Sequence, residues 1–246
     1  VGFLTQALPV KAEHDGKVWR VELAPQAGVE LVQPGGSGWP TLPDKLVVEC
    51  GAVVLAVGHT PFDATVKSRF GLGRVPGVIS ASQLEEWLAQ DDLSPYPEKM
   101  AFIQCVGSRD ESLSKLYCSR VCCGFALRMA RLVKSRNFQT QISFFHMDVQ
   151  SYGRSWEEEL EAMRKEMEFI SAMPGEVRKG PDGPQVCYAT SQSGQARADF
   201  DLVVLSNGLA PPAGAASLRE LFKMDNDRDG FLSDAASAGV FAAGTA

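Results

Sequence analysis

The chain alternates between short apolar runs and turns rich in glycine and proline. Residues 18–23 alternate apolar and polar side chains, which predicts a half-buried strand. Continuous apolar runs bounded by turn residues are typical of buried strands, and residues 186–190 predict a further short strand. The predicted buried strands are residues 52–57, 100–104, 141–147, 201–205 and 240–244.

Two longer stretches have the spacing of helices. Residues 118–135 repeat apolar positions every three or four residues, and residues 156–170 carry many paired charges that predict a solvated helix face. Residues 24–44 are rich in glycine and proline and predict a loop. Because strands and helices alternate along the chain, we expect an α/β fold with parallel sheets.

Composition places the chain among ordinary globular proteins. Of its 246 residues, 45% are apolar and 22% are charged, and the net charge of −6 argues against nucleic acid as a partner. No apolar run approaches the length of a membrane span, and no secretory signal is present at Val1. We therefore expect a cytoplasmic protein that does not itself span a membrane.

Four of the six cysteines fall within nineteen consecutive positions: Cys105, Cys118, Cys122 and Cys123. Cys105 directly follows the predicted strand 100–104, and the other three open the predicted helix. A strand end and a helix start can bring four sulfurs to one point, and a helix N-terminus favours negative charge. Crowded thiolates repel and oxidise unless a metal or a disulfide holds them. The distant Cys50 and Cys187 are expected to be ordinary core or surface thiols.

Three kinds of site are compatible with this spacing. Zinc ligands usually come as two short pairs, whereas the gaps here are twelve, three and zero residues. A disulfide framework requires an oxidising compartment, for which the sequence offers no sign. An iron–sulfur cluster is favoured, a zinc site comes second, and a redox disulfide third.

The chain resembles the A-subunit family of heterodisulfide reductases at its cysteine motifs, CVGSRD and YCSRVCC. The flanking stretches agree: AVVLAVGHTPFD and FGLGRVPGVISASQLEEWL before these motifs, and DLVVLSNGLAPP after them. That family includes subunits of quinone-modifying oxidoreductases. The resemblance runs from about Cys50 to Ala246. It implies that Cys105, Cys118, Cys122 and Cys123 hold a [4Fe–4S] cluster beside FAD. It also implies an oxidoreductase subunit that passes electrons between FAD and iron–sulfur clusters, with other subunits of a redox complex as partners and a homo-oligomer as a possibility.

The resemblance also implies two Rossmann-like domains of the thioredoxin-reductase type, FAD/NAD(P)-binding-like, with parallel sheets and with the first incomplete. Residues 1–99 and 197–246 would form the FAD-binding-type domain, and residues 100–196 an inserted nucleotide-binding-like domain that carries the cysteines. The chain contains no strand–glycine-turn–helix for a pyrophosphate, so we expect it to be a piece of a longer protein. The stretch 105–108 stands where such a turn would lie, so the cluster would replace the nicotinamide nucleotide.

Cofactor contacts are expected at two matching strand-then-turn segments and near the last strand. The predicted flavin-binding residues are Gly58, Pro61, Gly208 and Gly244, although Thr245 stands where related flavoproteins carry Asp. Arg109 and Lys115 lie between the cysteines and would offset negative charge. Two other functions stay open: a pyridine-nucleotide-disulfide oxidoreductase that uses Cys122 or Cys123 as a redox dithiol, and a zinc-stabilised interaction domain.

Overall fold

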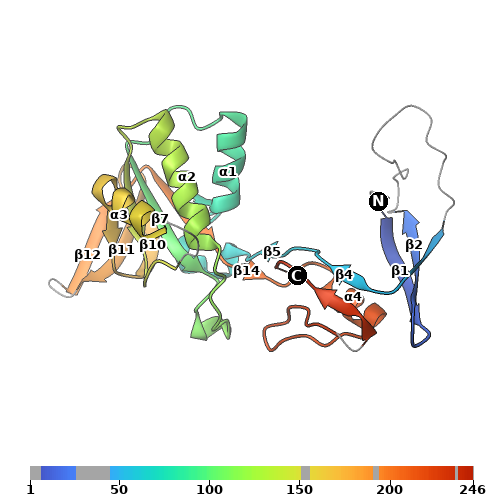
Figure 1. Ribbon diagram of the computed structural model, residues 1–246. Coiled ribbons are helices and arrows are strands. Elements are labelled where there is room, and N and C mark those ends of the chain that lie inside the picture. The colour runs from blue at the N-terminus through green and yellow to red at the C-terminus, as the bar shows by residue number, and fades with distance from the viewer. Residues whose placement is uncertain (1–6, 26–44, 151–155, 191–193, 236–237, 246) are drawn as a thin grey trace, which may run out of the picture. The chain divides into compact units, whose positions relative to one another are not determined.

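The computed structural model describes residues 7–25, 45–150, 156–190, 194–235 and 238–245 (Figure 1). The chain forms two compact units, one made of Val1–Thr60 with Ala210–Ala246 and the other of Pro61–Leu209. The chain passes between the units in the short strands β5 (Thr60–Pro61) and β14 (Leu209–Ala210). These borders differ from the predicted division at 99/100 and 196/197, because strands on both sides of residues 100–196 pair with the central sheet.

That central sheet has five parallel strands in the order β6-β13-β7-β8-β9. Its parallel strands confirm the predicted α/β class. The strands that were predicted at residues 100–104, 141–147 and 201–205 are all present within it. The bounds are β6 Val78–Ser80, β7 Lys99–Val106, β8 Gln141–Phe145, β9 Glu168–Ile170 and β13 Leu202–Asn207.

Helices cover one face of this sheet and a small antiparallel sheet covers the other. Helix α1 (Ala81–Gln90) starts with a capping box between Ser80 and Gln83. It packs with α2 (Cys122–Arg136) and α3 (Trp156–Glu166) over a core that includes Phe102, Leu127 and Phe144 (Figure 1). The other face packs against three antiparallel strands, β10 (Pro174–Lys179), β11 (Pro184–Thr190) and β12 (Gly194–Asp199).

Both predicted helices are shorter in the structure. The predicted helix 118–135 begins at Cys122, so Cys118 lies in the preceding loop. The predicted helix 156–170 ends at Glu166, and Glu168–Ile170 forms β9 instead. There the Phe169 ring stacks on Phe144 of β8 with a centroid distance of 5.0 Å. Burial of that aromatic pair against the sheet outweighs the helical spacing of the sequence.

The first unit contains an antiparallel sheet and a parallel strand pair. Strands β1 (Ala7–His14), β2 (Trp19–Pro25) and β3 (Leu46–Cys50) form the sheet, so the predicted strand 18–23 is present. Strand β4 (Val53–Leu55) pairs in parallel with β15 (Val240–Ala242), and α4 (Ala215–Phe222) packs into the same core. The loop that was predicted at 24–44 lies almost wholly outside the described residues.

The prediction that residues 52–57 form a buried strand is wrong in its burial. Leu55 is buried, but Val54 is 63% exposed and Val57 is 44% exposed. Leu55 packs into the core of the first unit, whereas Val54 points to the opposite face of β4, which is exposed.

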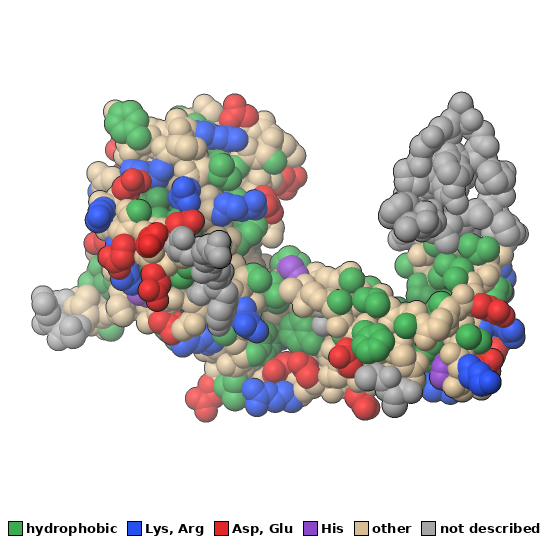
Figure 2. All heavy atoms as spheres, viewed as in Figure 1, with side chains coloured by type: hydrophobic (Ala, Val, Ile, Leu, Met, Phe, Trp, Pro, Cys, Tyr) green, Lys and Arg blue, Asp and Glu red, His purple; other side chains and the backbone are tan. Residues whose placement is uncertain are grey.

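Figure 2 shows Lys and Arg side chains interspersed with Asp and Glu over the helices of the second unit. Such mixed charge is typical of a solvated helix face. No helix within the described ranges is long and apolar enough to cross a membrane.

Candidate metal centre

Cys105 lies at a bulge at the carboxyl end of β7. Ile103 pairs with Leu205 and Val106 with Asn207, so two residues of β7 face one residue of β13. Cys105 has a φ of 58°, in the left-handed region, which costs a residue with a side chain about 1 kcal/mol or more. Bulges of this kind re-aim a side chain at the end of a strand. The bulge that sets the direction of the Cys105 side chain therefore also holds the Cys105 backbone in a strained conformation.

The segment between Cys105 and Cys118 forms a small hydrogen-bonded hairpin. Arg109 N–H donates to the Tyr117 carbonyl at 2.9 Å, and Asp110 and Lys115 exchange backbone hydrogen bonds of 2.8 and 3.0 Å. A short 3-10 helix, Glu111–Leu113, forms its tip, which projects beyond the first turn of α2 (green loop in Figure 1). The loop that carries the cysteines is thus organised by its own backbone.

Side chains anchor this hairpin to the neighbouring strand end. The Tyr117 hydroxyl donates to the Leu209 carbonyl at 2.6 Å, and Leu209 N–H donates to Ser119 Oγ at 2.8 Å. A Cβ at Gly208 would lie 2.9 Å from Ser119 Oγ. Gly208, which was predicted to contact flavin, is required to be small because it packs against the cysteine segment.

A nearly buried ion pair joins Lys67 to Asp110, whose side chains are 8% and 12% exposed. Removing one partner leaves a buried charge unpaired. We expect Lys67→Met to lower the free energy of unfolding by about 3 kcal/mol, measured from urea unfolding curves. The exposed pair Arg128–Glu85 provides the control, because Arg128→Met should cost less than about 1 kcal/mol. Equal effects of the two substitutions would contradict the prediction.

Helix α2 begins without a side-chain cap. Its N-cap residue is Val121, a poor cap, and no side chain accepts a hydrogen bond there. Arg120 is left-handed (φ 64°) and Val121 right-handed (φ −104°, ψ −24°), a pair that turns successive N–H groups toward one side. Arg120 N–H donates to Cys118 Sγ at 3.3 Å. This helix start therefore presents amide donors and the positive end of the helix dipole to the thiols.

The thiols of Cys105, Cys122 and Cys123 form a hydrogen-bonded chain. Cys123 donates to Cys122, and Cys122 donates to Cys105. The hydrogen bond that Cys122 donates stabilises the Cys105 thiolate and lowers the pKa of Cys105. Cys122 would lose this hydrogen bond on deprotonation, so its own pKa rises to about 11. The hydrogen bond to Cys122, together with burial, raises the pKa of Cys123. Cys118 is half-buried and interacts electrostatically with Cys105 and Cys122, so all four predicted ligands are coupled.

A charged pair borders the thiols. Arg109 pairs with Asp148 and also interacts with Cys105 and Cys118, and each of these contacts raises the pKa of its guanidinium. Lys115 instead places its ammonium group 3.4 Å from the Tyr117 hydroxyl. Of the two basic residues that were predicted to offset thiolate charge, Arg109 is the one that interacts electrostatically with the cysteines.

The donor set can be compared with what a metal ion and an iron–sulfur cluster each require. Within the described ranges, no three His, Cys, Asp or Glu side chains are grouped as they would be around one metal ion. A [4Fe–4S] cluster takes one thiolate at each of four irons, so its ligands stand around a larger centre. Four coupled thiols at a strand end and an uncapped helix start, beside Arg109, supply the donors and the electrostatic environment for such a cluster.

The other two cysteines belong to other strands, β3 and β11. Cys50 ends β3 opposite Trp19, and the Cys187 sulfur on β11 accepts from Arg178 Nε at 3.1 Å.

Sequence reasoning missed Gln104 and His146, which are buried polar residues next to the centre. Gln104 was detectable in principle, because it is a lone polar residue in an apolar strand.

The remaining predicted flavin contacts are divided between the two units. In the first unit, Gly58 (φ 73°) and Gly244 (φ 74°) follow the parallel neighbours β4 and β15, and His59 Nδ1 lies 3.1 Å from Thr245 Oγ1. A Cβ at either glycine would meet no atom within 4 Å. Pro61 is exposed and belongs to the second unit, as does Gly208.

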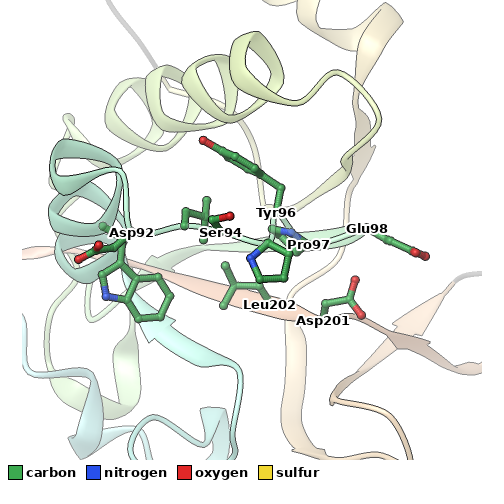
Figure 3. A pocket seen from close by; sticks show the side chains of 10 residues that line it. Asp92, Ser94, Tyr96, Pro97, Glu98, Asp201 and Leu202 are labelled. Carbon is green, nitrogen blue, oxygen red and sulfur yellow. The ribbon is translucent and has the colours of Figure 1, made fainter.

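A surface hollow of about 550 Å³ is lined mostly by residues that precede β7, and no cysteine lines it (Figure 3). Tyr96, Pro97 and Glu98 line it beside the amino end of β7, and Asp201 and Leu202 line it at the start of β13. Ligands of parallel α/β sheets bind at the carboxyl ends of the strands, where Cys105 lies. We therefore place the candidate site at the cysteines and not in this hollow.

No protein-family model matches the chain. Curated relatives include the A subunit of the H2:CoB-CoM heterodisulfide, ferredoxin reductase of Methanothermobacter marburgensis, 34% identical over 84% of this chain and 33% of the relative. The iron-sulfur A subunit of the CoB–CoM heterodisulfide reductase of Methanocaldococcus jannaschii is 31% identical over 82% of this chain and 33% of the relative. The chain thus spans about a third of the length of these relatives. Among solved structures, LpdA of Mycobacterium tuberculosis matches all of this chain and 44% of its own with a TM-score of 0.51 at 14% identity, which shows a shared fold.

Proposed function

Because this chain belongs to the A-subunit family of heterodisulfide reductases, we propose that Cys105, Cys118, Cys122 and Cys123 hold a [4Fe–4S] cluster in an electron-transferring oxidoreductase subunit. The observation that carries the proposal is the hydrogen-bonded chain of the Cys105, Cys122 and Cys123 thiols at the end of β7 and the start of α2, with the Cys118 thiol interacting electrostatically with two of them. The printed name of one relative, an iron-sulfur subunit, supports the choice of metal.

The cluster supplies a one-electron carrier when bound. The surrounding residues have separate tasks. Arg109 offsets negative charge near Cys105 and Cys118, and Arg120 N–H donates to the Cys118 sulfur. Because thiolates are the ligands, cluster binding would require Cys105, Cys122 and Cys123 to release their thiol protons and give up the hydrogen bonds between them.

FAD is the proposed electron partner of this cluster in the whole protein. We assign the unit of residues 1–60 and 210–246 to the FAD-binding type, with Gly58 and Gly244 at the carboxyl ends of its parallel strands. The unit of residues 61–209 has the nucleotide-binding-like sheet, in which the cysteine segment takes the place of a glycine turn. The protein would pass electrons between FAD and clusters of other subunits, towards a disulfide or a quinone-linked acceptor, in the cytoplasm.

The redox-dithiol alternative has one observation in its favour. Cys122 donates a hydrogen bond to Cys105 and lowers its pKa, as occurs at reactive thiols. In that case Cys105 and Cys122 would form a reversible disulfide and bind no iron. A zinc site would instead retain about one zinc ion per chain through four ligands.

Anaerobic reconstitution with iron and sulfide separates these functions. We expect about four iron and four sulfide per chain, with a broad visible absorption that reduction bleaches. The control is the same chain after its thiols have been alkylated in urea, which should hold no cluster. Stoichiometric zinc with no iron, or a Cys105–Cys122 disulfide and no metal, would overturn the proposal.

A further inference from the structure

Two buried polar residues lie side by side at the carboxyl ends of β7 and β8. Phe102 of β7 pairs in register with Phe144 of β8, and their rings stack at 4.9 Å. Gln104 lies two residues beyond Phe102, and His146 lies two residues beyond Phe144. Because side chains alternate along a strand, both point to the sheet face that α2 covers.

Their polar atoms lack partners. Gln104 is 2% exposed, and neither Oε1 nor Nε2 has a hydrogen-bond partner. His146 is 8% exposed, and its Nδ1 has none either. Buried polar groups are nearly always hydrogen-bonded, so neighbouring unsatisfied atoms call for an absent partner.

Both residues line a small hollow together with Cys123. The other lining residues are Leu127, Phe144, Val149 and Phe169. Cys123 is the one residue of this lining, besides Gln104 and His146, whose side chain carries a heteroatom, and it comes from α2. Gln150 N–H already donates to that sulfur. The hollow thus joins two unsatisfied side chains to one predicted cluster ligand.

We propose that Gln104 Nε2–H and His146 Nδ1–H donate hydrogen bonds to sulfur on the Cys123 side of the cluster and raise its reduction potential. The inference rests on the proposed [4Fe–4S] site. Reduction adds negative charge to the cluster, and donors to its sulfurs stabilise that charge. Burial, and secondarily Arg164, lowers the pKa of His146. Gln104 and His146 are tuning residues and not ligands.

The test compares reconstituted wild-type chain with Gln104→Leu and His146→Phe. In EPR-monitored redox titrations we expect full iron in each variant and a reduced-to-oxidised ratio about tenfold lower at fixed potential. For a one-electron couple this equals a shift of about −59 mV. Ser143→Ala is the matched control, because that buried hydroxyl on β8 already donates to Glu168 at 2.7 Å. It should leave the ratio unchanged.

The outcomes separate this inference from the cluster itself. Full iron with unchanged potentials in both variants would overturn the inference and leave the cluster in place. Wild-type chain that binds no iron would overturn both. If a variant fails to fold, wild-type chain with side-chain ¹⁵N-labelled glutamine and histidine decides the matter. Hyperfine coupling of these nitrogens to the reduced cluster supports the inference, and its absence overturns it.

Discussion

Replacing any one of Cys105, Cys118, Cys122 and Cys123 by alanine is expected to lower iron retention well below the about four iron per chain of a four-thiolate cluster. Each substitution removes one of four ligands, and no neighbouring sulfur replaces it, because Cys50 and Cys187 lie elsewhere. Iron, labile sulfide and the visible spectrum of anaerobically reconstituted chain measure the effect. The loss should be largest for the buried residues Cys105, Cys122 and Cys123, which water cannot easily replace as ligands.

Cys50→Ala and Cys187→Ala are the matched controls for these substitutions. Each removes a partly buried thiol of the same chain, so iron content and spectrum should stay at the wild-type level. The adjacent pair Cys122 and Cys123 is the most demanding part of the assignment. Full iron and an unchanged spectrum in Cys123→Ala would show that the two neighbours do not ligate the same cluster.

Gly107→Ala should produce the largest loss of stability among the predicted substitutions. Gly107 has a φ of 85°, and an added methyl group would overlap the Phe62 ring. That ring cannot withdraw easily, because Phe62 N–H donates to Gly208 and the Phe62 carbonyl accepts from Asn207 Nδ2 at 2.6 Å. Overpacking and the left-handed backbone together predict a cost of about 3 kcal/mol or more. Urea unfolding and iron retention should both report it.

Gly73→Ala isolates the steric part of this effect. Gly73 has a similar φ of 73°, but its added methyl group would meet no atom within 4 Å. The backbone penalty alone then predicts a cost of about 1 kcal/mol. If the two substitutions destabilise the chain equally, Phe62 does not press on Gly107 and the turn after Cys105 tolerates a side chain.

Several features of the site could be read from the sequence because they depend on local spacing. The apolar run before Cys105 predicted a strand that ends in a thiol, and the periodic stretch after Cys122 predicted a helix that starts with two. Both elements form, as β7 and α2. Parallel α/β topology then places a strand end beside a helix start. The identities of the four coupled cysteines therefore followed from the pattern alone.

Other features depend on contacts between distant parts of the chain. Residues 168–170 carry helical spacing, yet they form β9 because Phe169 stacks on Phe144. The borders of the second unit fall at 60/61 and 209/210 because β6 and β13 complete the sheet of β7. Residues 52–57 look like a buried strand, but burial depends on what covers a strand, and only Leu55 of β4 is buried while Val54 is exposed.

The sequence by itself determined the α/β class, seven of the fifteen strands in the described part of the chain and the four cysteines whose thiols interact, since alternation, helical spacing and cysteine spacing are properties of neighbouring residues. Only the tertiary structure decided which way those thiols point and what surrounds them. Cys105 adopts its left-handed backbone where β7 bulges against β13, and Arg109, paired with Asp148 from a segment far away in the sequence, interacts electrostatically with Cys105 and Cys118. Gln104 and His146 become neighbours through strand register, a long-range pairing that no local pattern encodes.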